Sequence, residues 1–77
     1  MGDGYDEVRR VLALNVRTLR DHRRLSQEAL AIAADVDRTY VSQIERGIGN
    51  PSLFILHKLS RVLSVDVADL VTQLDKS

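Results

Sequence analysis

The segment from Arg38 to Arg46 places long hydrogen-bonding side chains along one face of a potential helix. At about 100° per residue, this face gathers arginine, hydroxyl and amide side chains and holds no carboxylate: Arg38, Thr39, Ser42, Gln43 and Arg46. The opposite face holds Tyr40, Val41 and Ile44, of which the aliphatic residues can pack on a core. A face that is only solvated usually mixes Glu and Lys, so this composition favours a binding surface. A solvated face is the competing interpretation.

No residues in the sequence have the spacing that catalysis or metal binding requires. His22 and His57 are far apart and the chain has no Cys, so neither histidine has partners at the spacing of a metal site. The sequence has no Gly-rich phosphate loop and no nucleophile–histidine pair, and Ser26 and Ser52 suit helix caps. We therefore expect no enzymatic activity, no metal, no cofactor and no small-molecule ligand.

Size and composition indicate one small domain. The chain has 77 residues, of which 44% are hydrophobic, with one Pro and no Cys. We expect a single domain over residues 1–77 in a reducing compartment, and the apolar runs are too short to span a membrane. The formal net charge is zero, whereas DNA-binding domains are usually basic. Residues 1–24 nevertheless carry six Arg against four acids, and local placement decides phosphate contacts.

The elements that would position this face are helices, because no stretch alternates with the period of a strand. Capping residues and Gly, Asn and Pro mark the helix ends. The expected helices span about residues 6–22, 26–34, 38–46, 53–63 and 67–74. In the first helix apolar residues recur at helical spacing: Val8, Val11, Leu12, Val16 and Leu19. The positions expected to face inward are Leu53, Leu56, Leu59 and Leu63 in the fourth helix and Val67, Leu70, Val71 and Leu74 in the fifth. The sequence thus predicts an all-α, compact five-helix bundle.

The second and third helices are separated by only three residues, Asp35 to Asp37. Two helices joined this closely cross steeply, as in a helix-turn-helix, which we place at about residues 26–46. Ala31 is small where the helices must approach each other. Asp35 occupies the turn position at which the backbone tends to have a positive φ, and Asp tolerates that conformation better than most residues.

The predicted helix-turn-helix and its flanking helices resemble those of a known family. The stretch "LSQEALAIAADVDRTYVSQIERGIGNPSLFILHKLSRVLSVDVADL" is similar to the Cro/CI-type (XRE) helix-turn-helix domain of phage repressors and bacterial regulators, over about residues 10–71. Its small size and the phrase "DRTYVSQIERG" resemble the controller proteins of restriction–modification systems in particular. The resemblance implies that the helix at about residues 38–46 enters the major groove of DNA.

The resemblance also implies roles for individual residues. Base contacts are expected from the exposed face of the third helix: Arg38, Thr39, Ser42 and Gln43. Backbone contacts are expected from Gln27, Arg46, Asn50 and Arg24. An ordinary helix or turn residue is the alternative for Gln27 and Asn50, and a solvated charge run is the alternative for Arg24. Tyr40 lies opposite the reading face, which favours packing over DNA contact.

One carboxylate, Glu45, lies at the margin of the reading face. In the family this Glu pairs with an Arg of the first helix, and Arg20 matches that place. We therefore expect a partly buried Arg20–Glu45 ion pair that fixes the third helix on the first.

Specific binding by one short helix usually requires a two-fold dimer on a palindrome, with half-sites about 34–36 Å apart. In the fourth helix Phe54 falls on the outer arc with Lys58 and Arg61, so it is a candidate interface anchor. The patch extended from it comprises Phe54, Ile55, Val62 and Val65. The alternative is that Phe54 folds back beneath the first helix or a loop.

The sequence therefore predicts a homodimeric, sequence-specific DNA-binding transcriptional regulator acting on double-stranded DNA. We expect it in the cytoplasm of a bacterium or in a phage context, associated with the nucleoid. The competing hypothesis is an antitoxin or anti-repressor that sequesters a protein partner, which the near-neutral pI of 6.7 leaves open.

Overall fold

The computed structural model describes residues 4–73, and within that range every regular element is a helix. The helices are α1 (Tyr5–His22), α2 (Gln27–Ala34), α3 (Arg38–Glu45), α4 (Leu53–Leu63) and α5 (Val67–Val71). The all-α, five-helix prediction is therefore confirmed. α5 is shorter than expected because Thr72 is extended, and Leu74 lies outside the described residues.

The helix starts are set by short polar side chains that accept otherwise unpaired backbone N–H groups. Ser26 Oγ accepts from the Ala29 N–H at 2.9 Å, and Ser52 Oγ accepts from the Ile55 N–H at 3.1 Å. At the start of α5 the pairing is reversed, since the Asp69 carboxylate accepts the Asp66 N–H at 2.9 Å. These caps fix where α2, α4 and α5 begin.

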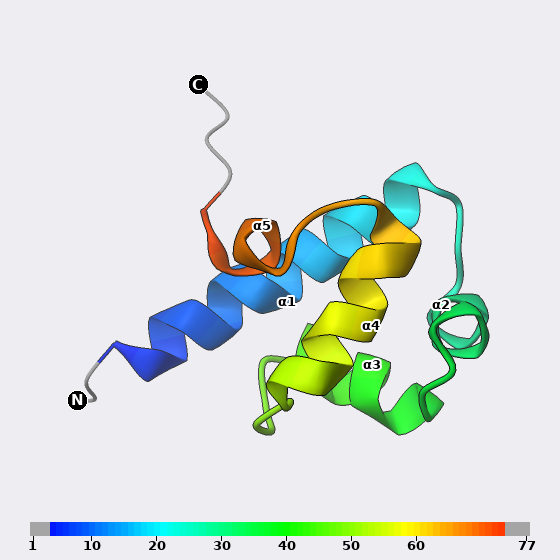
Figure 1. Cartoon of the computed structure of the whole chain (residues 1–77). Helices are drawn as coiled ribbons and strands as arrows, with labels where there is room; N and C mark the ends of the chain where they lie inside the picture. The colour runs from blue at the N-terminus through cyan, green and yellow to red at the C-terminus, as the bar shows by residue number, and fades with distance from the viewer. Residues whose placement is uncertain (1–3, 74–77) are drawn as a thin grey trace.

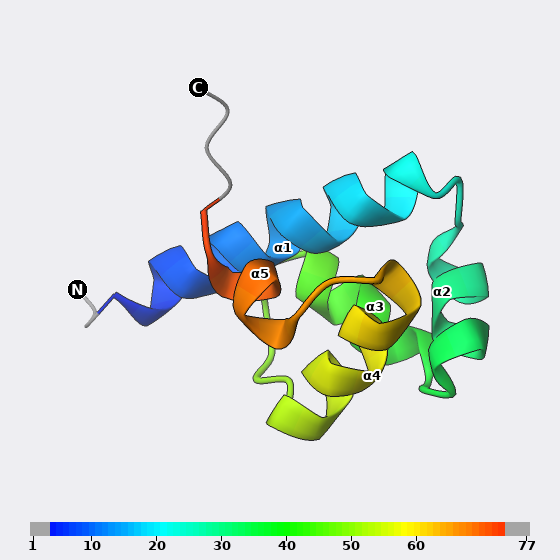
Figure 2. The same ribbon diagram turned by 45° about the horizontal axis from the view of Figure 1, so that its top comes forward.

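The core lies where all five helices meet. α1 crosses the molecule and contacts α3 and α5, while α2 contacts α3 and α4 (Figures 1 and 2). The buried apolar side chains come from every helix: Leu12, Val16, Leu30, Ala31, Ala34, Val41, Ile44, Leu56, Leu59, Leu63 and Leu70. Because α3 contributes Val41 and Ile44 to this core, its other face is directed outward.

Two apolar residues expected to face inward are exposed instead, as is Val8 of the apolar repeat in α1. Leu53 is 72% exposed, and Val8 and Val71 are also exposed. All three lie in the first or last turns of their helices, which the neighbouring helices do not cover. The prediction that Leu53 and Val71 pack inward was therefore wrong, because periodicity alone ignores where a neighbour ends.

A buried polar residue joins α1 to α5. Asn15 is 3% exposed, and its Nδ2 donates to the carbonyls of Asp69, Leu70 and Thr72 at 3.2, 3.0 and 2.9 Å. These are carbonyls at the end of α5 that its short length leaves without helical partners. Asn15 therefore holds a five-residue helix that would be marginal alone.

Among residues 4–73, no helix combines the length and apolar character needed to cross a bilayer.

Candidate nucleic-acid interface

The turn between α2 and α3 has the left-handed residue that the sequence predicted. Asp35 has φ 60° and ψ 47°, which confirms the expectation of a positive φ at this position. Its N–H donates to the Ile32 carbonyl at 3.1 Å, and the next N–H, of Val36, donates to the Ala31 carbonyl at 3.0 Å. These bonds end α2 in one turn and redirect the chain into α3.

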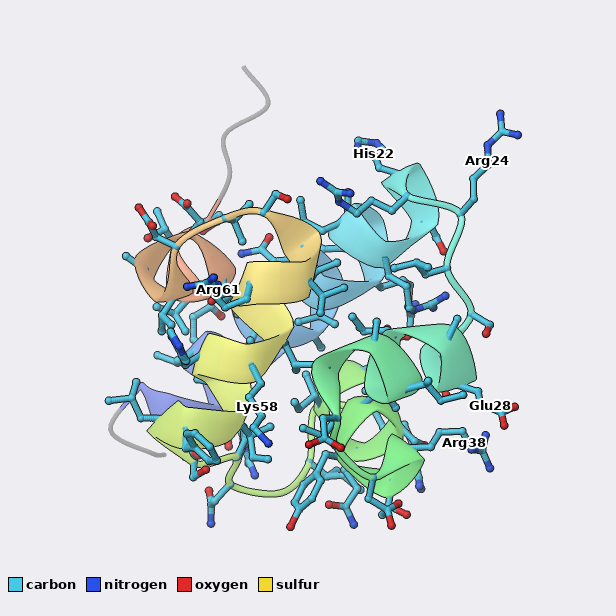
Figure 3. The ribbon with its side chains drawn as sticks, turned by 45° about the vertical axis from the view of Figure 1, so that its right-hand side comes forward. His22, Arg24, Glu28, Arg38, Lys58 and Arg61 are labelled. Carbon is cyan, nitrogen blue, oxygen red and sulfur yellow. The ribbon has the colours of Figure 1, made fainter. Side chains whose placement is uncertain are left out.

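α3 presents the predicted polar face to solvent. Arg38, Thr39 and Arg46 are exposed, and Ser42 and Gln43 are half-buried but accessible. Figure 3 shows Arg38 extending away from the ribbon, toward the same side as Glu28 of α2. Among residues 4–73, the side chains of Arg38, Ser42 and Arg46 have no hydrogen-bond or ion-pair partner. They are free to bind another molecule.

Thr39 is partly committed to the start of its own helix. Its backbone N–H donates to the Asp37 carboxylate at 2.8 Å. That hydrogen bond is the main reason why the pKa of Asp37 is lowered below its ordinary value, and a second hydrogen bond, from the Thr39 hydroxyl, adds to the effect. Asp37 therefore stays charged and caps α3. Because the Thr39 hydroxyl is engaged by Asp37, the methyl group is the part of the Thr39 side chain that remains available for contact with another molecule.

Glu45 lies at the centre of a buried charge network at the end of α3. Its side chain is 2% exposed. Arg20 donates to it twice, from Nε to Oε2 at 2.6 Å and from Nη2 to Oε1 at 2.9 Å. The Arg20–Glu45 ion pair is thus present, in the bidentate form that is strongest for Arg and carboxylate.

Two further side chains contact Glu45. The Gln27 Nε2 donates to Oε1 at 3.0 Å, and Arg17 donates from Nη2 to the backbone carbonyl at 3.3 Å. The Arg17 Nε also lies 3.8 Å from Oε1. Arg17 was not among the residues predicted to contact Glu45, although its three-residue spacing from Arg20 places both on one side of α1.

The network keeps Glu45 ionised. Burial by itself would raise the pKa of Glu45, but the hydrogen bonds from Arg20 and Gln27 and the positive charges of Arg20 and Arg17 outweigh it, so the pKa is lowered. The Glu45 hydrogen bond in turn raises the pKa of Arg20. The carboxylate is thereby covered and neutralised instead of facing a polyanion.

The residues predicted to contact a DNA backbone are divided between different surroundings. Arg46 is exposed at the end of α3. The Gln27 amide points inward to Glu45, while the backbone of Gln27 begins α2. Arg24, which has φ 58°, lies on the loop between α1 and α2 and extends away from the body, far from Arg38 (Figure 3). The structure therefore does not bring Arg24 together with the α3 face.

The loop after α3 is held by a contact that the sequence did not reveal. Gly47 and Gly49 have φ 74° and 82°, and a Cβ at Gly49 would lie 3.3 Å from the Gln43 Oε1. The next residue, Asn50, accepts a hydrogen bond at Oδ1 from the hydroxyl of Tyr5. Only the fold could reveal this pair, since it joins residues 45 apart.

The predicted dimer patch is uneven. Phe54 is 63% exposed, so it points outward as expected, and the Lys58 ammonium lies 4.7 Å from its ring centroid. By contrast Ile55, Val62 and Val65 are half-buried and pack against the core. Leu53, beside Phe54, is exposed to a greater extent than Ile55, Val62 and Val65.

Comparison with known proteins agrees with this geometry. The family model described as Helix-turn-helix matches residues 16–70. The chain belongs to the helix-turn-helix family. The Cro/CI-type resemblance proposed from the motifs is therefore confirmed.

Relatives of this helix-turn-helix protein include named control proteins. It is 40% identical over 67 residues to the control protein C.BamHI of Bacillus amyloliquefaciens, covering 86% of this chain and 83% of that protein. The structure of the restriction-modification controller protein C.AhdI from Aeromonas hydrophila superposes with a TM-score of 0.76 at 37% identity, covering 80% of this chain and 94% of that one.

A second solved structure matches over more of the chain. The hypothetical transcription factor NHTF from Neisseria superposes with a TM-score of 0.83 at 37% identity, covering 95% of this helix-turn-helix chain and 83% of that one. The relatives are named as control proteins and transcriptional regulators, not as enzymes, in agreement with the expectation of a non-enzymatic chain.

Across residues 4–73 there is no group of three His, Asp or Glu that could hold a metal ion.

Proposed function

We propose that this helix-turn-helix protein is a sequence-specific DNA-binding transcriptional regulator that acts as a homodimer on a palindromic operator. The observation that carries the proposal is the division of α3 into two faces. Val41 and Ile44 are buried in the core, while the opposite face offers an unpartnered arginine and hydroxyl and amide groups to a partner.

The side chains of this face suit base edges in the major groove. A guanidinium can donate two hydrogen bonds to guanine O6 and N7, and an amide can pair with adenine. We assign Arg38 and Gln43 to these roles, with Ser42 and the methyl group of Thr39 between them. Arg46 and Asn50 supply phosphate contacts beside α3, and Gln27 contributes through the backbone N–H groups at the start of α2, since its amide is engaged by Glu45. Such contacts orient the protein without specifying sequence, and Arg24, which lies away from the α3 face, is not assigned to them.

The dimer would form through the start of α4. α3 has eight residues and can read only a few base pairs, so a second copy is needed for specificity. Phe54 and Leu53 supply exposed apolar surface at the start of α4, and the proposed interface continues along the helix and past its end through the half-buried Ile55, Val62 and Val65. Two copies would place their α3 helices about one DNA turn apart, at 34–36 Å.

The relatives named as control proteins favour a controller role in a restriction–modification system. In this proposal the protein acts in the bacterial cytoplasm on its operator near a promoter. Dimerisation coupled to DNA binding would make operator occupancy rise steeply with protein concentration.

Titration of an Arg38→Ala variant tests the proposed function. Loss of a bidentate base contact should weaken binding to an operator selected by the wild-type protein about 5- to 150-fold, the equivalent of about 1–3 kcal/mol. Binding to random DNA should change little, because phosphate contacts remain. Fluorescence anisotropy on both duplexes at several salt concentrations measures this.

The matched control is Arg10→Ala, which removes the same charge from an exposed residue that pairs with Glu7 on α1. It should leave discrimination between operator and random DNA unchanged. Equal operator affinities for Arg38→Ala and wild-type protein would refute the assigned reading face. Failure of the wild-type protein to prefer any DNA sequence would favour a protein-interaction module instead.

A further inference from the structure

The hydrogen bond between Tyr5 and Asn50 holds the Asn50 side chain against α1. An Asn side chain has one acceptor oxygen and an NH2 group with two donors. The phenol of Tyr5 donates to the Asn50 Oδ1. With its oxygen engaged by α1, the amide turns its NH2 group away from that contact, and a phosphate oxygen accepts hydrogen bonds and cannot donate them.

We propose that Tyr5 is a positioning residue that holds the Asn50 side chain in place, so that its NH2 group can donate to a DNA phosphate. The proposal rests on the DNA-binding function proposed above and deepens it by assigning a role to a residue outside the helix-turn-helix. The phosphate selects the arrangement in which Tyr5 donates to Oδ1, because a rotated amide would present its oxygen to the phosphate and be repelled.

The loop around Asn50 has little else to fix the position of this side chain. Asn50 is exposed and follows two glycines with positive φ, Gly47 and Gly49, which are permissive backbone positions. No other side-chain hydrogen bond to Asn50 is present among residues 4–73. The Tyr5 hydroxyl is therefore the group that restricts the amide.

Tyr5 is itself held on α1. The Arg9 guanidinium lies 5.0 Å from the centroid of the Tyr5 ring, one turn further along the helix. Arg9 in turn forms an ion pair with Asp6. The phenol thus projects from the first turn of α1, a helix whose later turns pack in the core, whereas the loop it contacts lies between α3 and α4. This arrangement sets the amide before DNA arrives and reduces the ordering that binding requires.

The test is a Tyr5→Phe substitution, which removes the hydroxyl and keeps the ring beneath Arg9. Operator affinity should fall about two- to tenfold, the equivalent of one ordinary hydrogen bond. In the free protein, the NMR signals of the Asn50 NH2 group should shift, while the unfolding midpoint should stay close to that of the wild-type protein.

The same substitution in an Asn50→Ala background is the internal control. Asn50→Ala should weaken operator binding, and adding Tyr5→Phe should then cause no further loss. An equal loss from Tyr5→Phe in both backgrounds would overturn the proposal, because it would show that Tyr5 acts through α1 and not through Asn50. No loss in the wild-type background would overturn it as well.

An Asn50→Asp variant separates donation from contact. Aspartate keeps an oxygen acceptor for Tyr5 but has no donor for phosphate, so operator binding should be at least as weak as for Asn50→Ala. The Arg38→Ala variant separates a failure of the Tyr5 role from a failure of the proposed DNA-binding function. If Arg38→Ala weakens operator binding and Tyr5→Phe does not, only the role of Tyr5 fails. If neither weakens it, the proposed function fails.

Discussion

At the scale of single residues, the main feature is the treatment of the one carboxylate at the end of the reading face. Glu45 is enclosed by Arg20, Gln27 and Arg17, and its side chain is only 2% exposed. Arg20 also lies 3.4 Å from the Asp21 carboxylate, so the two arginines and two carboxylates of this cluster are formally neutral. The ion pair thus fixes α3 on α1 and removes a charge that would repel DNA.

Replacement of Arg20 measures the structural part of this role. Arg20→Met should lower the free energy of unfolding by about 3 kcal/mol, because it leaves a buried carboxylate with weaker partners. Arg10→Met is the matched control, since it breaks the exposed Arg10–Glu7 pair, which should contribute less than about 1 kcal/mol. Urea denaturation followed by circular dichroism compares the two variants.

The double variant Arg20→Met, Glu45→Met should recover part of the loss, because it leaves no unpaired buried charge. Equal stabilities of the Arg20→Met and Arg10→Met variants would contradict the account of this pair.

Sequence reasoning identified the Arg20–Glu45 pair only because a family resemblance supplied it. Arg17 and Gln27 lie on helices that the sequence predicted, but their contacts with Glu45 span 28 and 18 residues. Contacts of this length depend on how helices pack, which periodicity does not specify. The Tyr5–Asn50 pair escaped prediction for the same reason.

At the scale of elements, local chemistry accounts for the helix-turn-helix. Ser26 and Asp37 cap α2 and α3, and Asp35 takes the left-handed conformation that ends α2. Asp is a compromise at this position, because every residue with a Cβ is strained at positive φ and Gly is not.

Substitutions at Asp35 test this description of the turn. Asp35→Gly should be more stable than Asp35→Ala by about 1 kcal/mol, because only glycine adopts φ 60° without strain. At Ala33, an exposed position within α2, the order should be reversed. Ala33→Gly should lose about 0.5–1 kcal/mol relative to the wild-type protein. Thermal unfolding of the three variants measures both differences.

The same sign of the Gly–Ala difference in stability at both positions would contradict the assigned turn conformation.

Helix starts and this turn could be predicted from sequence because caps and positive φ depend on a few adjacent residues. The exposure of apolar residues in the first and last turns of the helices could not be predicted in this way. Leu53, for example, fits the apolar period of α4 and yet has no neighbour to cover it.

At the scale of the whole molecule, the zero net charge does not conflict with DNA binding. Acidic residues are used inside the protein's own structure, as with Asp37 at a cap, Asp69 at the start of α5 and Glu45 in its ion pair. The arginines of the α3 face have no such partners among the described residues. Charge placement, and not the sum, therefore determines which face can approach a polyanion.

Assembly is the other property of the whole molecule. Phe54→Ala should raise the dissociation constant of the dimer about 30-fold or more if Phe54 is a central anchor, equivalent to about 2 kcal/mol. Monomer stability should change little because Phe54 is 63% exposed. Leu14→Ala on α1 is the matched control, since Leu14 is 62% exposed and lies outside the proposed interface. Analytical ultracentrifugation measures both constants.

If the two variants dissociate equally, or if the wild-type chain stays monomeric at tens of micromolar and on DNA, the interface assignment fails.

The central claim is that the exposed face of α3 reads DNA sequence, and selection from random DNA tests it most directly. The wild-type protein should enrich a two-fold symmetric motif whose half-sites are one helical turn apart. Arg38→Ala should enrich the same motif with the preference for guanine lost at one position in each half-site. An identical motif from both proteins, or no motif from either, would contradict the claim.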